Sequence, residues 1–420
     1  MKLKLHKQKI RKRSRTQTAN GAYEYVFLAT VTMMMLALGT VMVFSAGLAS
    51  AYFDQEDSYY WLLRQLAFGA IGIICMFSLS RLDFYRFRKA APLFMTASLA
   101  LLLLVLIPGL GVENNGARRW LALSVVNPQP SEIAKLAVVL SLAAAMSSRP
   151  RLLTSAREMS LRILVLPAAV CFLVLIEPDL GTAIAIAVTV LGMLLVGGVR
   201  LKVMATPILG ATVLGLLSVM VKPHQMDRLT AFIDPWQDAN GTGHQIIQSW
   251  YAIGSGGLSG VGLGNSVQKF YYLPEPHTDM IFSIIGEEMG LLGALMVIGG
   301  FSAFGYMGFR IAIKCRNTFG KYVAAGITSM VVGQAAINLC AVTGLMPLTG
   351  VPLPLISYGG SSLIIILSSI GILLNIAVNP RSKIAAAPQR KISATEGGNR
   401  GRRNGRSPGA GAGSRRRAHG

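Results

Sequence analysis

Acidic side chains and a histidine gather in one short stretch of this sequence, residues 272–290, at the start of an apolar run. His277 and Asp279 open the stretch, and Glu287 and Glu288 follow about 12 Å deeper if the chain is helical there. A charged group in an apolar setting is costly, so ionisable residues at membrane depth are functional candidates. Side chains of these types exchange protons, which makes the stretch the first candidate for a reactive site.

The residues around Asp279 predict how it is held. Pro274 and Pro276 favour an extended chain up to Thr278, and Thr278 is a suitable cap for a helix that begins at Asp279. On such a helix Ser283 shares a face with Asp279, whereas the neighbouring isoleucines face lipid or other helices. We therefore expect the polar face to line a cavity inside the protein.

The composition places this stretch in a membrane protein. Hydrophobic residues make up 52% of the 420 residues and charged residues 14%, and the mean hydropathy is +0.52. About ten apolar segments are long enough to cross a bilayer. We predict an all-α polytopic membrane protein with about ten transmembrane helices in residues 25–378, the first of which is a retained anchor rather than a cleaved signal peptide.

Positive charge sets the predicted orientation. Of the 40 Lys and Arg residues, 33 fall in the two ends of the chain and in alternate loops, as expected for cytoplasmic segments. The N- and C-termini are therefore predicted to be cytoplasmic, and one long loop, residues 222–278, to be extracytoplasmic. The basic head, 1–24, and the basic Gly/Arg/Ser-rich tail, 379–420, are expected to be disordered. They lack interleaved aromatic residues, so we assign them to topology and anionic lipid rather than to nucleic acid.

The outer loop is too long for a simple connector. It includes a run of glycines, residues 254–264, that no strand–helix unit precedes, so a nucleotide-binding loop is not expected. Two interpretations remain: the glycines let the loop fold as a platform against the bundle, or their backbone amides bind phosphate. The four cysteines have no paired spacing and predict neither a disulfide nor a metal site.

A further pair of opposite charges opens the fourth span, in the segment Pro130-Ser-Glu-Ile-Ala-Lys135. Ser131 is a plausible helix cap there. Glu132 and Lys135 are three residues apart on one helical face, so they form either an internal ion pair or part of a site.

Three other segments are expected on the same outer side. Arg118 and Arg119 lie in the second outer loop. Asp179, in the turn 177–181, either caps the next helix or contributes its carboxylate to the site. The paired prolines and glycines of residues 350–362 predict a broken, re-entrant entry into the last span, which a membrane protein accommodates only where it lines a cavity.

Five of these segments together resemble the SEDS family of bacterial peptidoglycan polymerases, over about residues 25–380. The segments that carry the resemblance are Pro130–Lys135, Glu177–Thr182, Gly264–Lys269, Tyr272–Glu288 and Pro352–Gly360. Within the family, residues 234–236, 264–266 and 349–352 look more like the division branch than the elongation branch, and the sporulation branch shares much of the pattern.

The resemblance implies a glycosyltransferase that joins lipid II disaccharide units at the outer face of the cytoplasmic membrane. The 4-hydroxyl of an acceptor sugar attacks the anomeric carbon of a lipid-linked donor, inverts it and expels undecaprenyl pyrophosphate. Such a step requires a base beside the hydroxyl and positive charge beside the diphosphate. Asp279 matches the family's essential aspartate and is the predicted catalytic base. A helix start would lower its pKa, whereas burial would raise it.

The resemblance also suggests which residues bind the substrate. Cations at family positions are expected to contact the diphosphate or the lipid head group. Nearby acids are expected to orient those cations or to hold a divalent ion, Mg²⁺ or Mn²⁺, although no ligand spacing predicts a metal site. The histidine is equally well explained as a structural residue. The predicted substrate-binding residues are Arg119, Glu132, Lys135, Asp179, Lys269, His277 and Ser357.

Other functions compete with this interpretation. A lipid II flippase would also place polar residues inside a ten-span bundle. The ionisable residues concentrate on the outer side and no inverted repeat is visible, which favours the polymerase over the flippase and over a non-catalytic scaffold. Within the family, an elongation polymerase is the alternative to a division enzyme. The partners implied are lipid II, a class B penicillin-binding transpeptidase and other divisome membrane proteins, in the cytoplasmic (inner) membrane at the division septum.

Overall fold

The computed structural model describes residues 2–55, 57–83, 85–114, 117–122, 127–270 and 272–379. These ranges are mostly helical, with one short β-hairpin and two 3₁₀ turns. The elements in chain order are α1 Lys2–Gln55, α2 Tyr60–Arg81, α3 Tyr85–Val105, β1 Gly111–Asn114, β2 Ala117–Leu121, α4 Pro130–Ser148, η1 Pro150–Thr154, α5 Ala156–Arg162, α6 Val165–Ile176, α7 Leu180–Val196, α8 Leu201–Val221, α9 Pro223–Ile233, η2 Pro235–Asp238, α10 His244–Ser255, α11 Ile281–Lys314, α12 Thr318–Val342 and α13 Gly360–Val378.

Eight helices of the described chain are long and apolar enough to cross a membrane: α1, α2, α3, α4, α8, α11, α12 and α13. The helices α5 and α6 meet at a bend of 61° and form a further span if they are taken as one. The remaining apolar helix, α7, has 17 residues, at the lower limit for a span. The prediction of an all-α polytopic membrane protein is confirmed.

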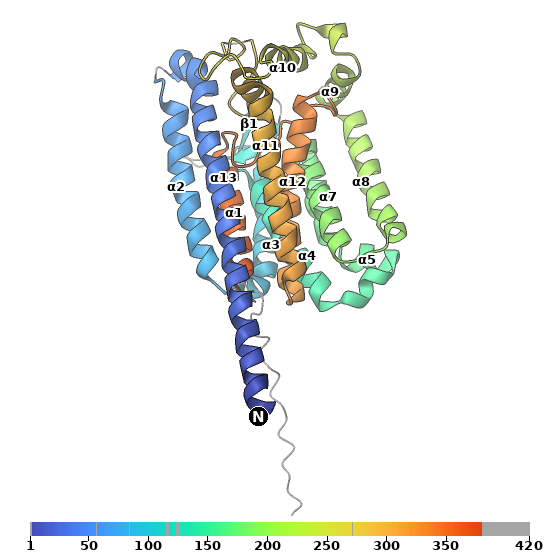
Figure 1. Cartoon of the computed structure of the whole chain (residues 1–420). Coiled ribbons are helices and arrows are strands. Elements are labelled where there is room, and N and C mark those ends of the chain that lie inside the picture. The colour runs from blue at the N-terminus through green and yellow to red at the C-terminus, as the bar shows by residue number, and fades with distance from the viewer. Residues whose placement is uncertain are drawn as a thin grey trace, which may run out of the picture. The chain divides into compact units, whose positions relative to one another are not determined.

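The core of the bundle surrounds α12, which packs against α4, α7, α11 and α13 and buries most of its side chains (Figure 1). The helix α13 packs closely along α2, because Gly371 lies directly against the backbone of Met76 and leaves no room for a side chain. By contrast α8 is at the edge, and Met204 is its buried residue. The polar groups discussed below therefore converge on the end of the bundle that α4, α11 and α12 share.

The loop between α8 and α11 folds against the bundle, as one of the two interpretations of its glycines predicted. Its helices α9 and α10 lie at the end of the bundle where α11 begins (Figure 1). The glycine-rich segment pairs with α11: the amides of Val261 and Gly262 donate to the carbonyls of Glu287 and Glu288, each at 3.0 Å. Gly290, with φ of +62°, kinks α11 at this contact. The loop is therefore a platform, and the Gly262 amide is already bonded within the protein.

Three expectations about the ends and loops are changed or left open. The head, expected to be disordered, is helical from Lys2 onward, because Lys, Arg, Gln and Leu favour helix and neither proline nor glycine interrupts residues 2–20. The second outer loop contains an antiparallel hairpin of β1 and β2 that no sequence pattern predicted. Residues 115–116 and the tail beyond Asn379 lie outside the described residues.

Candidate active site

Asp279 lies in the turn that leads into α11, and its side chain is partly exposed. Thr278 Oγ1 lies 3.2 Å from Asp279 Oδ1, and the backbone carbonyl of Asp279 accepts a 2.7 Å hydrogen bond from Asn338 Nδ2 on α12. The predicted helix start is wrong. The helix begins at Ile281, because the Thr278 hydroxyl is 3.0 Å from the Glu275 carbonyl and does not cap it. Asp279 is therefore positioned by α12 and by its own turn, before the span begins.

Arg228 on α9 faces Asp279 across Gly350, although no sequence motif indicated it. A carbon at the Cβ position of Gly350 would lie 3.7 Å from Arg228 Nη1 and 3.9 Å from Asp279 Oδ2. Glycine adopts the φ of +67° found here without strain, and its missing side chain lets both charged groups approach. The charge pattern could have indicated Arg228, because it leaves few Lys and Arg residues on the outer side and Arg228 is one of them.

The charge state of Asp279 suits a base. Burial raises the pKa of this carboxyl to about 6, against the opposing effects of the Arg228 charge and the Thr278 hydroxyl. Burial therefore decides the direction of the shift, which the sequence left open. A carboxylate with this pKa is ionised at neutral pH and still has appreciable affinity for a proton.

Two further cations lie at the turn between α6 and α7. Arg119 on β2 donates to the carbonyl of Pro178, and its Nε is buried without a partner in the described chain. Lys222, just after α8, donates to the carbonyls of Leu175 at 2.5 Å and Ile176 at 3.2 Å. Burial and, second, the charge of Arg119 lower the pKa of Lys222. The turn therefore concentrates positive charge that an anionic group could share.

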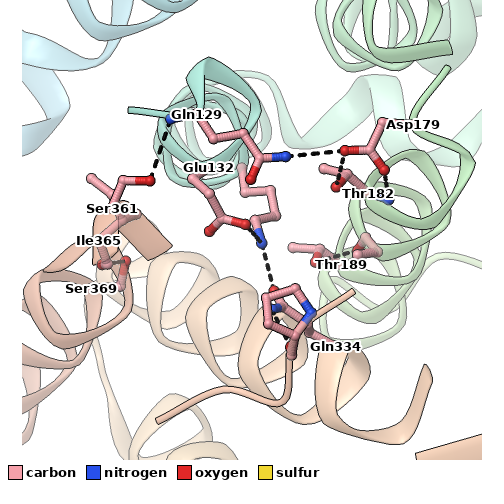
Figure 2. A network of polar contacts seen from close by, with 12 residues as sticks. Gln129, Glu132, Asp179, Thr182, Thr189, Gln334, Ser361, Ile365 and Ser369 are labelled. Atoms are coloured by element: carbon pink, nitrogen blue, oxygen red, sulfur yellow. Dashed lines mark hydrogen bonds and ion pairs between the residues drawn. The ribbon is translucent and has the colours of Figure 1, made fainter. Parts of the chain in front are cut away.

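The acids of this turn have separate roles. Asp179 caps α7 by accepting from Thr182 N at 3.0 Å and Thr182 Oγ1 at 2.8 Å, so the capping interpretation is confirmed. It also accepts from Gln129 Nε2 at 3.2 Å (Figure 2). Its Oδ1 lies 4.0 Å from Arg119 Nη1. Burial and, second, the charge of Asp179 raise the pKa of Glu177 to about 9, so Glu177 is protonated at neutral pH.

Glu132 and Lys135 form the internal ion pair that the sequence left as one of two alternatives. Lys135 Nζ lies 2.8 Å from Glu132 Oε1 and 2.5 Å from Gln334 Oε1, and all three side chains are buried (Figure 2). The hydrogen bonding of the pair is incomplete, because Glu132 Oε2 is buried without a partner among the described residues. Ser131 does not cap the helix as predicted, since α4 begins one residue earlier with Pro130 in its first turn.

The segment before α13 is irregular and buried, as its prolines and glycines predicted. Asn338 Nδ2 donates to the carbonyl of Val351 at 2.8 Å as well as to that of Asp279, so one side chain of α12 ties this segment to the candidate base. Ser357, a predicted substrate ligand, closes a turn instead: its Oγ accepts from Leu353 N at 2.8 Å. Ser357 is buried and bonded within its own segment, so its contacts do not support the predicted role in substrate binding.

His277 is part of an aromatic cluster. Its ring centroid lies 4.2 Å from that of Trp61 and 5.8 Å from that of Tyr358, and its backbone carbonyl accepts from Tyr358 N at 2.9 Å. Its Nε2 is 3.9 Å from a carboxylate oxygen of Glu275. These contacts favour the structural alternative for this histidine, which braces the turn two residues before Asp279.

Lys269 is completely buried in a separate network, and its expected role in substrate binding is not supported by its contacts. Its Nζ lies 3.0 Å from Glu288 Oε1, 2.5 Å from the Gly264 carbonyl and 3.3 Å from Ser45 Oγ. A lysine has three N–H donors, so all three are used. The hydroxyl of Ser45, which has one hydrogen to donate, lies 2.6 and 2.8 Å from the two oxygens of Glu288. This closed network joins α1, the glycine-rich segment and α11.

Ser266 and Lys269 have the Ser-x-x-Lys spacing of penicillin-binding proteins. The structure explains the pair differently, because Ser266 is buried and donates its hydroxyl to Glu287 Oε2 at 2.5 Å. Glu287 accepts in addition from Val267 N at 2.9 Å. The serine is therefore part of the scaffold and is not an accessible nucleophile.

Arg228 also lines a cavity of about 550 Å³ beneath α9 and α10, next to Pro274 and Leu348. Arg228 also lines a second, smaller cavity of about 70 Å³, together with Pro178 and Gln225. Within the described ranges no three His, Cys, Asp or Glu side chains gather to hold a metal ion.

The fold and this site define a polytopic membrane protein whose outer-loop end presents the Asp279 carboxylate, several cations and a cavity with polar lining residues. A family model described as "Cell cycle protein", which groups FtsW, RodA and SpoVE, matches residues 25–382. The chain therefore belongs to the FtsW/RodA/SpoVE family, the SEDS family that the motifs indicated.

Two relatives show the range of the family. The chain is 40% identical to Stage V sporulation protein E of Bacillus subtilis, over 82% of this chain and 94% of the relative. It is 38% identical to a protein of Geobacter sp. named "Probable peptidoglycan glycosyltransferase FtsW", over 83% of this chain and 95% of the relative.

Two solved structures share the fold. RodA of Thermus thermophilus matches with a TM-score of 0.64 and 30% identity, over 85% of this chain and 97% of RodA. A chain of the solved structure "Structural coordination of polymerization and crosslinking by a peptidoglycan synthase complex" matches with a TM-score of 0.69 and 31% identity, over 85% of this chain and 98% of that chain.

Proposed function

We propose that this protein is an inverting peptidoglycan glycosyltransferase that polymerises lipid II at the outer face of the cytoplasmic membrane. The observation that carries the proposal is Asp279, a partly exposed carboxylate with a pKa of about 6 that faces Arg228 beside a polar cavity. The names of relatives at about 40% identity support the same reaction class.

In the proposed reaction Asp279 removes the proton from the 4-hydroxyl of the acceptor sugar. The hydroxyl oxygen forms the new bond to the anomeric carbon of the donor, the bond to the diphosphate breaks, and its electron pair leaves with undecaprenyl pyrophosphate. Direct displacement inverts the anomeric carbon. Arg119 and Lys222, at the turn between α6 and α7, stabilise the negative charge that develops on the diphosphate.

The buried pair of Glu132 and Lys135 is connected to this site through Gln334. Gln334 accepts from Lys135 and donates to the carbonyl of Pro352 at 2.9 Å, in the segment that Asn338 connects to Asp279. Lys135 has a third N–H donor, and Glu132 Oε2 has no partner among the described residues, so the pair can contact a head group as well. Lys269 and Ser357 act as scaffold, and His277 braces the turn of Asp279.

The cellular setting is also part of the proposal. The relatives named FtsW favour septal synthesis during cell division in the inner membrane, with RodA-like elongation as the alternative. The matching peptidoglycan synthase complex coordinates polymerisation with crosslinking, which supports a class B penicillin-binding transpeptidase as partner of this chain, together with other divisome membrane proteins.

The test is polymerisation of purified lipid II in detergent by the purified protein, alone and with its transpeptidase. Detergent micelles have no two sides, so a flippase produces nothing there, whereas a polymerase makes glycan strands that are visible on a gel. We expect strands from the wild-type complex. A complex that moves lipid II across vesicle membranes and makes no strands in detergent would show the flippase to be the correct function.

A further inference from the structure

Five cations at the end of the bundle away from α9 and α10 have no role in the proposed reaction. They lie on the connection between α4 and α6, which contains η1 and α5, and at the start of α8, which packs against α5 (Figure 1). All five residues are exposed: Arg149, Arg151, Arg157, Arg200 and Lys202. We call the surface that they form the basic surface.

The positive charge of the basic surface is not balanced by nearby acids. Glu158 is the one acid in residues 149–166 and 197–204, and its carboxylate lies 3.0 Å from Arg162. None of the five cations pairs with a carboxylate among the described residues. Like charges on neighbouring elements repel one another, so binding of an anion that neutralises them is favourable.

The basic surface belongs to a folded part of the protein. Leu153 of η1 and Met159 of α5 are buried in the core of the bundle, and the Thr154 hydroxyl donates to the Arg151 carbonyl at 2.8 Å. The helix α5 bends by 61° from α6, so it does not continue the direction of that span. Packing therefore holds in place the elements that carry the cations.

The helix α8 indicates the depth at which the basic surface lies. It is long and apolar enough to span a membrane, and only 6% of its apolar stretch is buried within the protein, so lipid surrounds it along its length. Arg200 immediately precedes this helix, and Leu201 and Lys202 are its first two residues. Cations that flank a span lie at the level of the lipid head groups. The basic surface is therefore expected at a membrane–water interface.

The neighbours of the cations favour phospholipid over a soluble anion. Leu161 of α5 and Leu201 of α8 are 62% and 74% exposed. A phospholipid covers such side chains with its acyl chains and brings a phosphodiester to the cations, whereas a soluble anion leaves the leucines in water. An acidic protein would have to displace the lipid head groups that surround the start of α8.

We propose that the basic surface binds the head groups of anionic phospholipids, through the arginines of the connection between α4 and α6 and the two cations at the start of α8. The bound lipids neutralise charges that otherwise repel across the contact between α5 and α8, and so hold the loosely packed α8 to the bundle. This proposal is independent of the proposed function, because it involves neither lipid II nor Asp279.

The test places the full-length protein in nanodiscs of phosphatidylcholine, with or without phosphatidylglycerol, and measures hydrogen exchange of the backbone amides of residues 149–166. The variant Arg151→Gln with Arg157→Gln removes two charges from the basic surface. The matched control, Arg316→Gln with Lys321→Gln, removes two charges between α11 and α12, at the same end of the bundle (Figure 1). Thermal unfolding verifies that both variants are folded.

We expect phosphatidylglycerol to slow exchange in this segment by about fivefold or more in the wild type and in the control, and to have little effect in Arg151→Gln with Arg157→Gln. The proposal is overturned if exchange is equal in the two lipid mixtures, if the protection survives in that variant, or if the control loses it as well. Protection by soluble polyglutamate and not by phosphatidylglycerol would identify an acidic protein as the occupant and would also overturn the proposal.

Discussion

The described part of the chain contains two buried lysine–glutamate pairs that differ in how completely they are hydrogen-bonded. Lys269 and Glu288 form a closed pair, in which all three lysine donors are bonded and each carboxylate oxygen lies within hydrogen-bond distance of a donor. Glu132 and Lys135 form an open pair, in which one carboxylate oxygen is buried without a partner in the described chain. Saturated hydrogen bonding is typical of a scaffold, whereas unused hydrogen-bonding capacity in a buried pair favours a role in binding.

The largest effect on folding is expected at the closed pair. Lys269→Met leaves the Glu288 charge buried without its partner, which typically costs about 3–5 kcal/mol and should abolish most of the monodisperse protein in size-exclusion chromatography. Adding Glu288→Gln should recover part of the yield, because the charge is removed while an acceptor for Ser45 remains. Lys222→Met, at a partly exposed cation, is the control. Normal yield of Lys269→Met would show that the closed pair is not the scaffold we describe.

The open pair should respond in activity more than in folding. Lys135→Met is expected to reduce polymerisation by about tenfold or more and to lower stability by about 1–3 kcal/mol, because the oxygens of Glu132 and Gln334 lose a donor. Lys135→Arg should recover part of the activity, since a planar fork does not replace a point charge. Activity per folded molecule is the quantity to measure. Equal losses of folded protein and of activity would make this pair a scaffold like the other.

Glu177 provides a test of how burial affects a carboxyl group in the turn between α6 and α7. Its folded-state pKa of about 9 exceeds the usual carboxyl value of 4.5, so the folded protein retains a proton that the unfolded chain releases between these two values. Stability should therefore fall as pH rises through this window, by at most about 1.4 kcal/mol per pH unit. Glu177→Gln removes the effect: its melting temperature should exceed that of the wild type at pH 8 and approach it at pH 5. A constant difference between the two would contradict the raised pKa.

The smallest expected effect is a shift in the pH dependence of polymerisation, caused by a change of the Asp279 pKa. Polymerisation should decline as pH falls through about 6, because Asp279 must be ionised to accept a proton. In Arg228→Gln the carboxylate loses the charge that lowers its pKa, so the decline should move to higher pH by about one unit or less. Arg228→Lys keeps a positive charge and should keep the wild-type midpoint. An unchanged midpoint in Arg228→Gln would mean that Arg228 does not act on Asp279.

The sequence predicted the membrane fold and singled out Asp279 as the candidate base, and the reasons are physical. Hydropathy and helix length dictate spans, and Asp279 stands out because an acid at an apolar boundary is costly. The start of α11 could not be predicted, since the Thr278 hydroxyl has a competing partner in Glu275. The roles of Lys135 and Lys269 could not be separated either. Whether all three N–H donors of a lysine are bonded depends on residues distant in the sequence, such as Ser45.

Arg228 was missed for a related reason. It lies on a loop helix without a motif, and its position opposite Asp279 depends on the fold of the whole outer platform. The irregular segment before α13 was predicted correctly, because paired prolines and glycines prevent a helix locally whatever the surroundings.

The central claim is that Asp279 is the base that removes the proton from the acceptor hydroxyl, and one measurement tests it most directly. The polymerisation rate of Asp279→Asn in complex with its partner, normalised to monodisperse folded protein, should fall by a factor of about 10² to 10⁴. Lipid II binding should be retained, because a base acts in the transition state. If the folded Asp279→Asn protein makes strands at the wild-type rate, Asp279 is not the base and the account of the site is wrong.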